Sequence, residues 1–263
     1  MKSIKEPKGF VLYEGKSLYK ESENDIVVIL QTGNSANKKT GNMMQVWIML
    51  KDIDPVEANK LGLDNAICGI CTLRGIANND PERKEAINRT CYVNFQTVKT
   101  IYRSYKKGNY PKIDPVDASK MIKYNKIWCN RGLRFGAYGD PALIPTHVTN
   151  GLRSHLPKSM GITAYSHQAN YKHANIDPCF MLSCETLDQA KTQWDKGNRT
   201  ARTIKSVDEL QENEMFCPAT DQGGSRLQCF QCNLCNAERN KKNIAWLPHG
   251  KQHAINNLTL QLA

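Results

Sequence analysis

Three cysteines in the last 35 residues are spaced for metal binding. Cys229, Cys232 and Cys235 form a Cys-x-x-Cys-x-x-Cys run, and His249 and His253 follow it. Thiolates three residues apart converge on one ion when the backbone turns tightly, and an imidazole can complete a tetrahedron around Zn²⁺. The spacing predicts a structural zinc site with Cys229, Cys232, Cys235 and His249 as ligands. His253 is the substitute for the fourth position.

A second group of cysteines is less regular. Cys68 and Cys71 form a Cys-x-x-Cys pair, and Cys91 lies 20 residues beyond it. These thiols could form a second metal site, or they could be buried side chains that pair by chance. The other four cysteines are scattered, which is typical of small buried residues. They are Cys129, Cys179, Cys184 and Cys217.

Asp140 is the residue best suited to carboxylate chemistry. It lies in the segment GAYGDP, residues 136–141, just after a predicted strand at 133–138. In parallel α/β folds, reactive groups collect at the C-terminal ends of strands. Asp140 could therefore serve as a nucleophile or a base, or it could cap the turn that follows Pro141.

Polar side chains recur at the ends of the next predicted strands. Gln and His can read the edge of a nucleobase, and Arg can hold phosphate. If the strands are parallel, these groups meet in one pocket with Asp140. They are Tyr165, His167, Gln168, Glu185, Arg199 and Arg202.

The first part of the chain, residues 1–95, reads as strand-rich. Runs of β-branched and aromatic residues at 9–14, 25–31 and 43–50 predict three strands. The loop at 32–42 carries Lys38 and Lys39. It is either an ordinary hairpin connection or a source of backbone amides and lysines for phosphate.

Short strands and helices alternate from residue 90 onward. Residues 90–95 predict a strand, and Asp114 before Pro115 predicts the start of a helix. Thr186 with Gln189, and Ser206 with Glu209, match capping boxes. This alternation predicts an α/β fold, a (β/α) barrel that is irregular or incomplete in its first half. We expect a single domain over residues 1–263, with a zinc-stapled loop within residues 214–263.

Composition narrows the class of protein. The chain has 263 residues, 40% of them hydrophobic, and a formal net charge of +11. This excess of Lys and Arg favours a polyanionic partner, although it also serves solubility alone. The longest aliphatic runs are far shorter than the roughly 20 residues that span a bilayer. The first ten residues carry no secretory signal. We expect a cytoplasmic protein with no membrane partner.

Together these motifs resemble a known family. A basic α/β barrel, GAYGDP, TAYSHQ, SCET and the cysteine run with its histidine are similar to the tRNA-guanine transglycosylase superfamily. They look most like the shorter DpdA-like proteins of phages and bacteria, which place 7-deazaguanine bases in DNA. The resemblance covers roughly residues 130–250.

The resemblance implies base exchange in DNA, or in RNA, with a 7-deazaguanine base as the second substrate. A carboxylate attacks C1′ of the sugar, guanine leaves, and the deazaguanine takes its place. Asp140 would be nucleophile or base and Glu185 a proton carrier, while Tyr165, His167 and Gln168 contact a flipped base. Lys38, Lys39, Arg199 and Arg202 would hold the backbone. A phage protein of this kind would act in the host cytoplasm.

Three other interpretations remain open. The chain could be a zinc-stapled nucleic-acid-binding protein without catalysis. It could be an iron–sulfur enzyme built on Cys68, Cys71 and Cys91. It could also be a hydrolase that cuts the glycosidic bond at the same site without exchanging the base.

Overall fold

The computed structural model describes residues 7–33, 37–220, 224, 227–239 and 241–248. A first five-stranded sheet has the order β1-β2-β3-β4-β5. Strand β2 runs antiparallel to both of its neighbours, β1 and β3, whereas β3, β4 and β5 are parallel. Their bounds are β1 Gly9–Lys16, β2 Asp25–Gln31, β3 Met43–Leu50, β4 Gly132–Tyr138 and β5 Ile162–Thr163.

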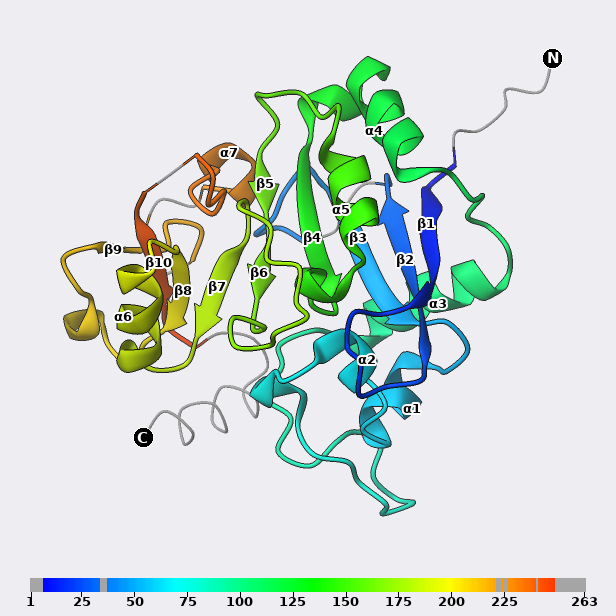
Figure 1. The fold of residues 1–263 in the computed structure, drawn as a ribbon, viewed down its shortest axis with the longest axis horizontal. Helices are drawn as coiled ribbons and strands as arrows, with labels where there is room; N and C mark the ends of the chain where they lie inside the picture. Colours follow the sequence, from blue (N-terminus) through cyan, green and yellow to red (C-terminus); the bar gives the residue numbers. More distant parts are fainter. Residues whose placement is uncertain (1–6, 34–36, 221–223, 225–226, 240, 249–263) are drawn as a thin grey trace.

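A second five-stranded sheet lies beside the first and is parallel throughout. Its order is β6-β7-β8-β10-β9. Only Ala164 separates β5 from β6, so one short stretch of chain serves both sheets, and Figure 1 shows these two strands meeting between them. The bounds are β6 Tyr165–Ser166, β7 Met181–Cys184, β8 Thr200–Thr203, β9 Glu214–Phe216 and β10 Asn243–Trp246.

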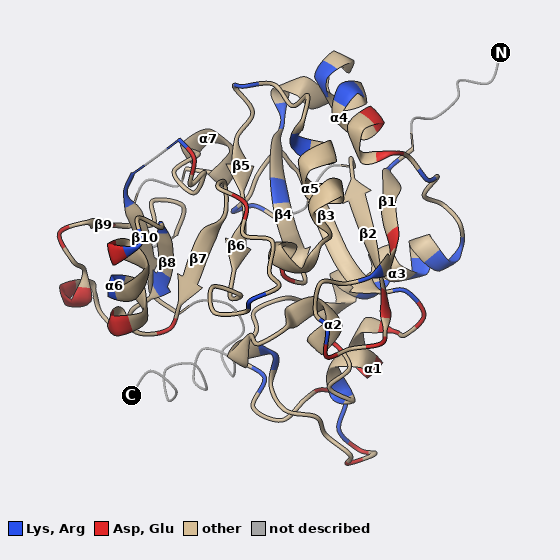
Figure 2. Cartoon of the chain, viewed as in Figure 1, with Lys and Arg blue, Asp and Glu red and all other residues tan. Residues whose placement is uncertain are grey.

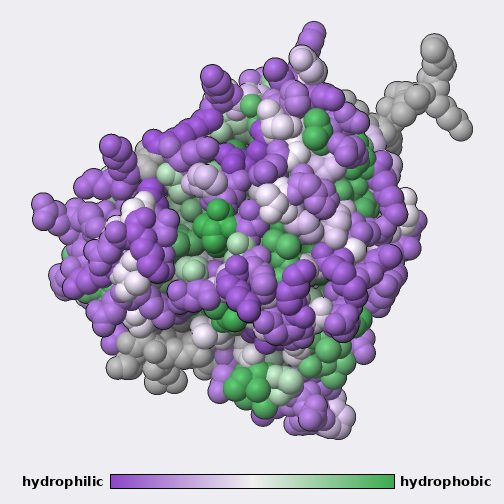
Figure 3. Space-filling model, viewed as in Figure 1, coloured by the Kyte–Doolittle hydropathy of each residue, from purple (hydrophilic) through white to green (hydrophobic). Residues whose placement is uncertain are grey.

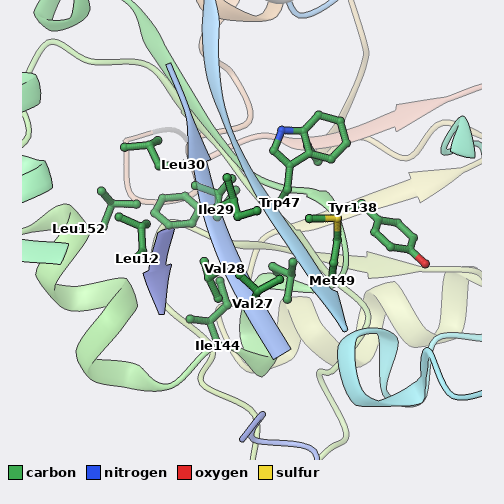
Figure 4. Packing of buried hydrophobic residues seen from close by; sticks show 14 of the residues in the cluster. Leu12, Val27, Val28, Ile29, Leu30, Trp47, Met49, Tyr138, Ile144 and Leu152 are labelled. Carbon is green, nitrogen blue, oxygen red and sulfur yellow. The ribbon is translucent and has the colours of Figure 1, made fainter. Parts of the chain in front are cut away.

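The main core surrounds β2 and β3. Every residue of β3 and all of 26–30 in β2 are buried, which explains why these runs are continuously apolar rather than alternating. Figure 4 shows Trp47 and Met49 of β3 on the side of Tyr138 from β4, and Val28 of β2 on the opposite side with Ile144 and with Leu152 of α5 (Thr146–Arg153). On the face in Figure 3, hydrophobic atoms form only scattered patches.

The longer helices begin where the sequence caps them. Asp114 accepts a hydrogen bond from Val116 N–H at the start of α4, and Thr186 with Gln189 forms the predicted capping box of α6. Helices α4 and α5 lie together over the first sheet, and α6 lies against the second (Figure 1). The bounds are α1 Pro55–Lys60, α2 Asn65–Cys68, α3 Phe95–Lys106, α4 Pro115–Tyr124, α5 Thr146–Arg153, α6 Leu187–Asp195 and α7 Cys229–Cys232.

Two local predictions were wrong. Residues 90–94 form no strand; the Asn94 side chain instead accepts from Gln96 N–H and begins α3 at Phe95. The Ser206 segment forms only a short 3-10 turn, η4 (Val207–Glu209), without a side-chain cap. The remaining 3-10 turns are η1 Thr72–Arg74, η2 Trp128–Asn130 and η3 Pro141–Leu143.

The α/β class and the three N-terminal strands are confirmed. The described residues do not show a closed barrel: their strands form one mixed and one parallel sheet. Lys and Arg are spread over the fold, whereas acidic residues gather near α6 and again around β1 and α1 (Figure 2). In the described part of the chain, no helix has both the length and the apolar character that a bilayer crossing requires.

Candidate functional site

A cavity of about 310 Å³, here called the main cavity, opens on the second sheet. The alternate residues Thr163, Tyr165 and His167 line it along one stretch of chain, because successive side chains of a strand point to opposite sides. Along the next strand and its end, Ser183, Cys184 and Glu185 all line it. The wall also includes Lys39, Tyr92, Arg134, Thr203 and Trp246.

His167 and Glu185 form the polar pair of this cavity. The Nε2 atom of His167 lies 3.4 Å from Oε1 of Glu185, and both side chains are partly exposed. Both residues also line a second hollow of about 200 Å³, here called the side cavity, together with Cys71. The pair therefore borders two spaces and can exchange a proton with a ligand in either.

Asp140 lies next to the predicted partners but outside the lining of the main cavity. Its Oδ1 accepts from Ala142 N–H at 3.0 Å. Its Oδ2 accepts from His167 N–H at 2.7 Å and from Gln168 Nε2 at 3.1 Å. Burial raises the pKa of this carboxyl, and the nearby charge of His167 opposes that rise.

This placement fits the capping interpretation of Asp140 and not the nucleophile interpretation. Only 6% of the residue is exposed, and both carboxyl oxygens are occupied by N–H donors. These hydrogen bonds to Asp140 hold η3 and the chain after β6 in place. Asp140 thus positions His167 through its backbone.

Gln168 is fully buried and lines neither cavity. Its Nε2 donates to the carbonyl oxygen of Cys68 at 2.9 Å, and its Oε1 accepts from Ile70 N–H at 3.1 Å. It therefore ties Asp140 to the loop that holds Cys68 and Cys71, rather than presenting its amide to a base.

Tyr165 does line the main cavity, as predicted for a base-contacting residue. Its ring meets Trp246 edge to face, with centroids 5.8 Å apart. Burial raises the pKa of its hydroxyl well above the ordinary value, so the phenol stays protonated. Tyr165, Trp246 and Tyr92 give the cavity three aromatic walls.

The predicted backbone-binding residues separate into two groups. Lys38 is exposed and Lys39 half-buried at the main cavity, both in the loop before β3. Arg199 and Arg202 are buried, 8% and 4% exposed. Their guanidinium groups serve internal contacts, which corrects the expectation that these arginines hold phosphates.

Arg202 pairs with a buried carboxylate. Its Nε and Nη2 atoms lie 2.9 and 2.6 Å from the two carboxyl oxygens of Glu214. Arg199 donates to the carbonyl oxygens of Leu234 and Asn236, each at 3.1 Å, and to that of Lys242. Arg199 therefore fastens the loop that contains Cys235.

Of the predicted zinc ligands, Cys229, Cys232 and Cys235 lie around one small void, whereas His249 is outside the described residues. Cys217, which the sequence analysis left among the scattered cysteines, lines the same void. As the described side chains stand, no three His, Cys, Asp or Glu residues are arranged to hold a metal ion. The signal for Cys217 was its position 12 residues before Cys229.

Sequence reasoning also missed Arg134, Tyr92 and Trp246. Arg134 is 8% exposed on β4 and donates to the Tyr92 hydroxyl at 3.0 Å. Arg134 and Tyr92 also line a groove of about 560 Å³ that runs beside β3 and α3. The only signal in the sequence was an arginine within an otherwise apolar strand.

Comparisons with protein-family models, with curated proteins and with solved structures give no match for this chain.

Proposed function

We propose that this protein exchanges guanine in DNA for a 7-deazaguanine base, with the main cavity as the site of the flipped base. In this proposal the two sheets are the wall of an incomplete (β/α) barrel, and the cavity is its mouth. DNA is the favoured acceptor and RNA the alternative. Zinc has a structural role only.

The cavity suits a planar polar ligand. Its volume of about 310 Å³ is at the lower end of the range for small-molecule sites, about 300–1,000 Å³. Tyr92, Tyr165 and Trp246 offer aromatic surfaces, and bases stack on such surfaces without regard to sequence. The buried Arg134 supplies a cationic donor at the wall.

The pair of His167 and Glu185 supports the chemistry. Glu185 is the carboxylate that lines the cavity, so we assign it, rather than Asp140, the attack on C1′ of the nucleoside. The bond from C1′ to guanine breaks as the bond to the Glu185 oxygen forms, and His167 gives the departing base its proton. The incoming deazaguanine then loses a proton to His167 and displaces Glu185 from C1′.

The charge and the groove support a nucleic-acid substrate. Lys39 stands at the cavity and Lys38 is exposed beside it, in a chain of net charge +11. The 560 Å³ groove shares Asn37, Tyr92 and Arg134 with the main cavity and gives room to the strand that flanks a flipped nucleotide.

The observation that carries the proposal is the 3.4 Å contact of His167 with Glu185 at the wall of an aromatic cavity. The test is nucleoside mass spectrometry of DNA from cells that express the protein and receive a deazaguanine supply. We expect modified deoxyguanosine with the native protein and none with Glu185→Gln. Unmodified DNA despite folded native protein overturns the proposal.

The same assay separates the rival interpretations. Abasic sites without deazaguanine incorporation would identify a hydrolase. DNA binding with a normal nucleoside profile, equal in the native protein and Glu185→Gln, would identify a binding protein without catalysis.

One observation favours a second candidate, an iron–sulfur enzyme. Cys71 lines the side cavity with His167 and Glu185, and its sulfur accepts from the N–H groups of Leu73 and Arg74. Cys91 N–H donates to the Leu73 carbonyl at 2.9 Å, which holds the third cysteine nearby. This candidate requires a brown protein that contains iron and sulfide; a colourless, iron-free protein purified without oxygen excludes it.

A further inference from the structure

Four cysteines are among the residues that line one void of about 10 Å³, here called the thiol cavity. Cys217 follows β9, Cys229 and Cys232 begin and end α7, and Cys235 follows three residues later. All four line the thiol cavity. A space of this size holds about one water molecule or one ion. Four cysteine sulfur atoms are one of the donor sets of structural zinc sites.

The backbone around these thiols turns as a metal loop must. Asn233, the residue after Cys232, has φ 54° and ψ 13°, a left-handed conformation that reverses the chain. The N–H of Leu234 donates to the sulfur of Cys232. The Tyr165 hydroxyl donates to the sulfur of Cys235. Hydrogen bonds of this kind orient the sulfur atoms of a metal site.

Positive groups stand near the same sulfurs. Arg199, whose charge acts on Cys235, also donates to the carbonyl oxygens of Leu234 and Asn236. The charges of Arg134 and Lys39 act on Cys229. A zinc ion with four thiolates carries two net negative charges, so these cations offset the charge of the site in a partly buried position.

We propose that Cys217, Cys229, Cys232 and Cys235 bind one Zn²⁺, with Cys217 in the position that the sequence analysis gave to His249. Zinc binding replaces four S–H bonds with four Zn–S bonds and releases four protons. Among the described residues, no three or more His, Cys, Asp or Glu side chains are arranged to hold a metal ion. To bind zinc, the four cysteine side chains must therefore rotate toward the thiol cavity that they line.

The site would also shape the main cavity. Cys217 and Cys229 line both spaces, so the metal would lie behind one wall of the main cavity. Cys229 N–H donates to the Lys39 carbonyl at 2.9 Å, and Phe230 N–H donates to that of Thr40 at 3.3 Å. The metal would therefore hold the loop of Lys38 and Lys39 against the second sheet, whichever reaction the protein performs.

The first test is the metal content of purified full-length protein, measured by elemental mass spectrometry. We expect one zinc per chain in the native protein, in His249→Ala and in the control Cys129→Ser, whose thiol lies elsewhere in the fold. Cys217→Ser should lose most of its zinc. Loss of zinc in His249→Ala with retention in Cys217→Ser overturns the ligand set, and iron with sulfide in place of zinc overturns the choice of metal.

The second test does not depend on how a variant folds. Native protein is alkylated with and without a chelator, and each cysteine is located by peptide mass spectrometry. We expect Cys217, Cys229, Cys232 and Cys235 to be protected together and to become reactive together when zinc is removed. Alkylation of Cys217 at the same rate in both samples contradicts the proposal. Neither test involves base exchange, so its result is independent of the proposed reaction.

Discussion

The Oδ2 atom of Asp140 accepts the backbone N–H of His167 at 2.7 Å, which links a buried carboxyl to the residue that faces Glu185. Asp140 and His167 therefore have two different roles. Asp140 holds the chain after β6 in position, and His167 lines the main cavity. Loss of either residue should impair the protein, but for different physical reasons.

Glu185→Gln should lower the rate of base exchange by about 10⁶-fold, the scale for removal of a covalent nucleophile. The amide keeps the size of the side chain but can neither attack C1′ nor carry the charge. Binding of the free deazaguanine base, measured by calorimetry, should change little. The control Glu212→Gln is exposed and lies outside the main cavity and should behave as the native protein. Equal turnover in both variants would contradict the assignment.

Asp140→Asn should destabilise the fold by about 1–3 kcal/mol, because the amide brings an N–H₂ group to a place that three N–H donors already fill. Urea unfolding measures this loss. A variant as stable as the native protein, yet inactive, would instead support the nucleophile interpretation.

The difference in the free energy of unfolding between the native protein and Asp140→Asn should also depend on pH. The pKa of Asp140 is raised by burial above 3.8, so the folded state binds its proton more tightly than the unfolded state. As pH rises from about 3.8 through the raised pKa, this carboxyl therefore reduces the free energy of unfolding. Asp140→Asn removes that dependence. The stability advantage of the native protein over the variant should shrink across this window, and a constant or growing advantage contradicts the raised pKa.

Arg202→Met should cost about 3–5 kcal/mol, because it leaves the Glu214 carboxylate buried without its partner. The double change Arg202→Met with Glu214→Met should recover most of this loss, since no buried charge remains. Thermal unfolding of the native protein, the single variant and the double variant measures both the loss of stability and its recovery. If Arg202 held DNA instead, the single variant would keep its stability and lose affinity.

Lys38→Ala with Lys39→Ala should weaken DNA binding and lower the slope of log K against log salt by about 0.9 for each lost phosphate contact. Lys196→Ala, an exposed lysine that lines neither the main cavity nor the groove, is the matched control. Fluorescence anisotropy over a salt series measures both. An unchanged slope in the double variant would remove this loop from the interface.

The sequence alone determined the local features of this protein. The β-branched and aromatic runs of β2 and β3 predicted strands, and Asp114 and Thr186 predicted the starts of α4 and α6. These features depend on neighbouring residues in the chain, so periodicity and capping chemistry reveal them. The strand expected at residues 90–95 failed where a competing local signal, the Asn94 cap, began a helix.

Only the tertiary structure decided which polar groups face the main cavity. Asp140 and Gln168 follow strands, as Glu185 does, and Arg199 and Arg202 lie directly before and within β8; yet the fold buries the four and leaves Glu185 at the cavity. Burial depends on partners that are distant in the chain: Gln168 meets Cys68 across 100 residues, and Arg199 meets Leu234 across 35. The spacing of residues along the chain does not reveal such distant contacts. Residue type and strand position could therefore identify candidate site residues, but could not show which of them face the main cavity.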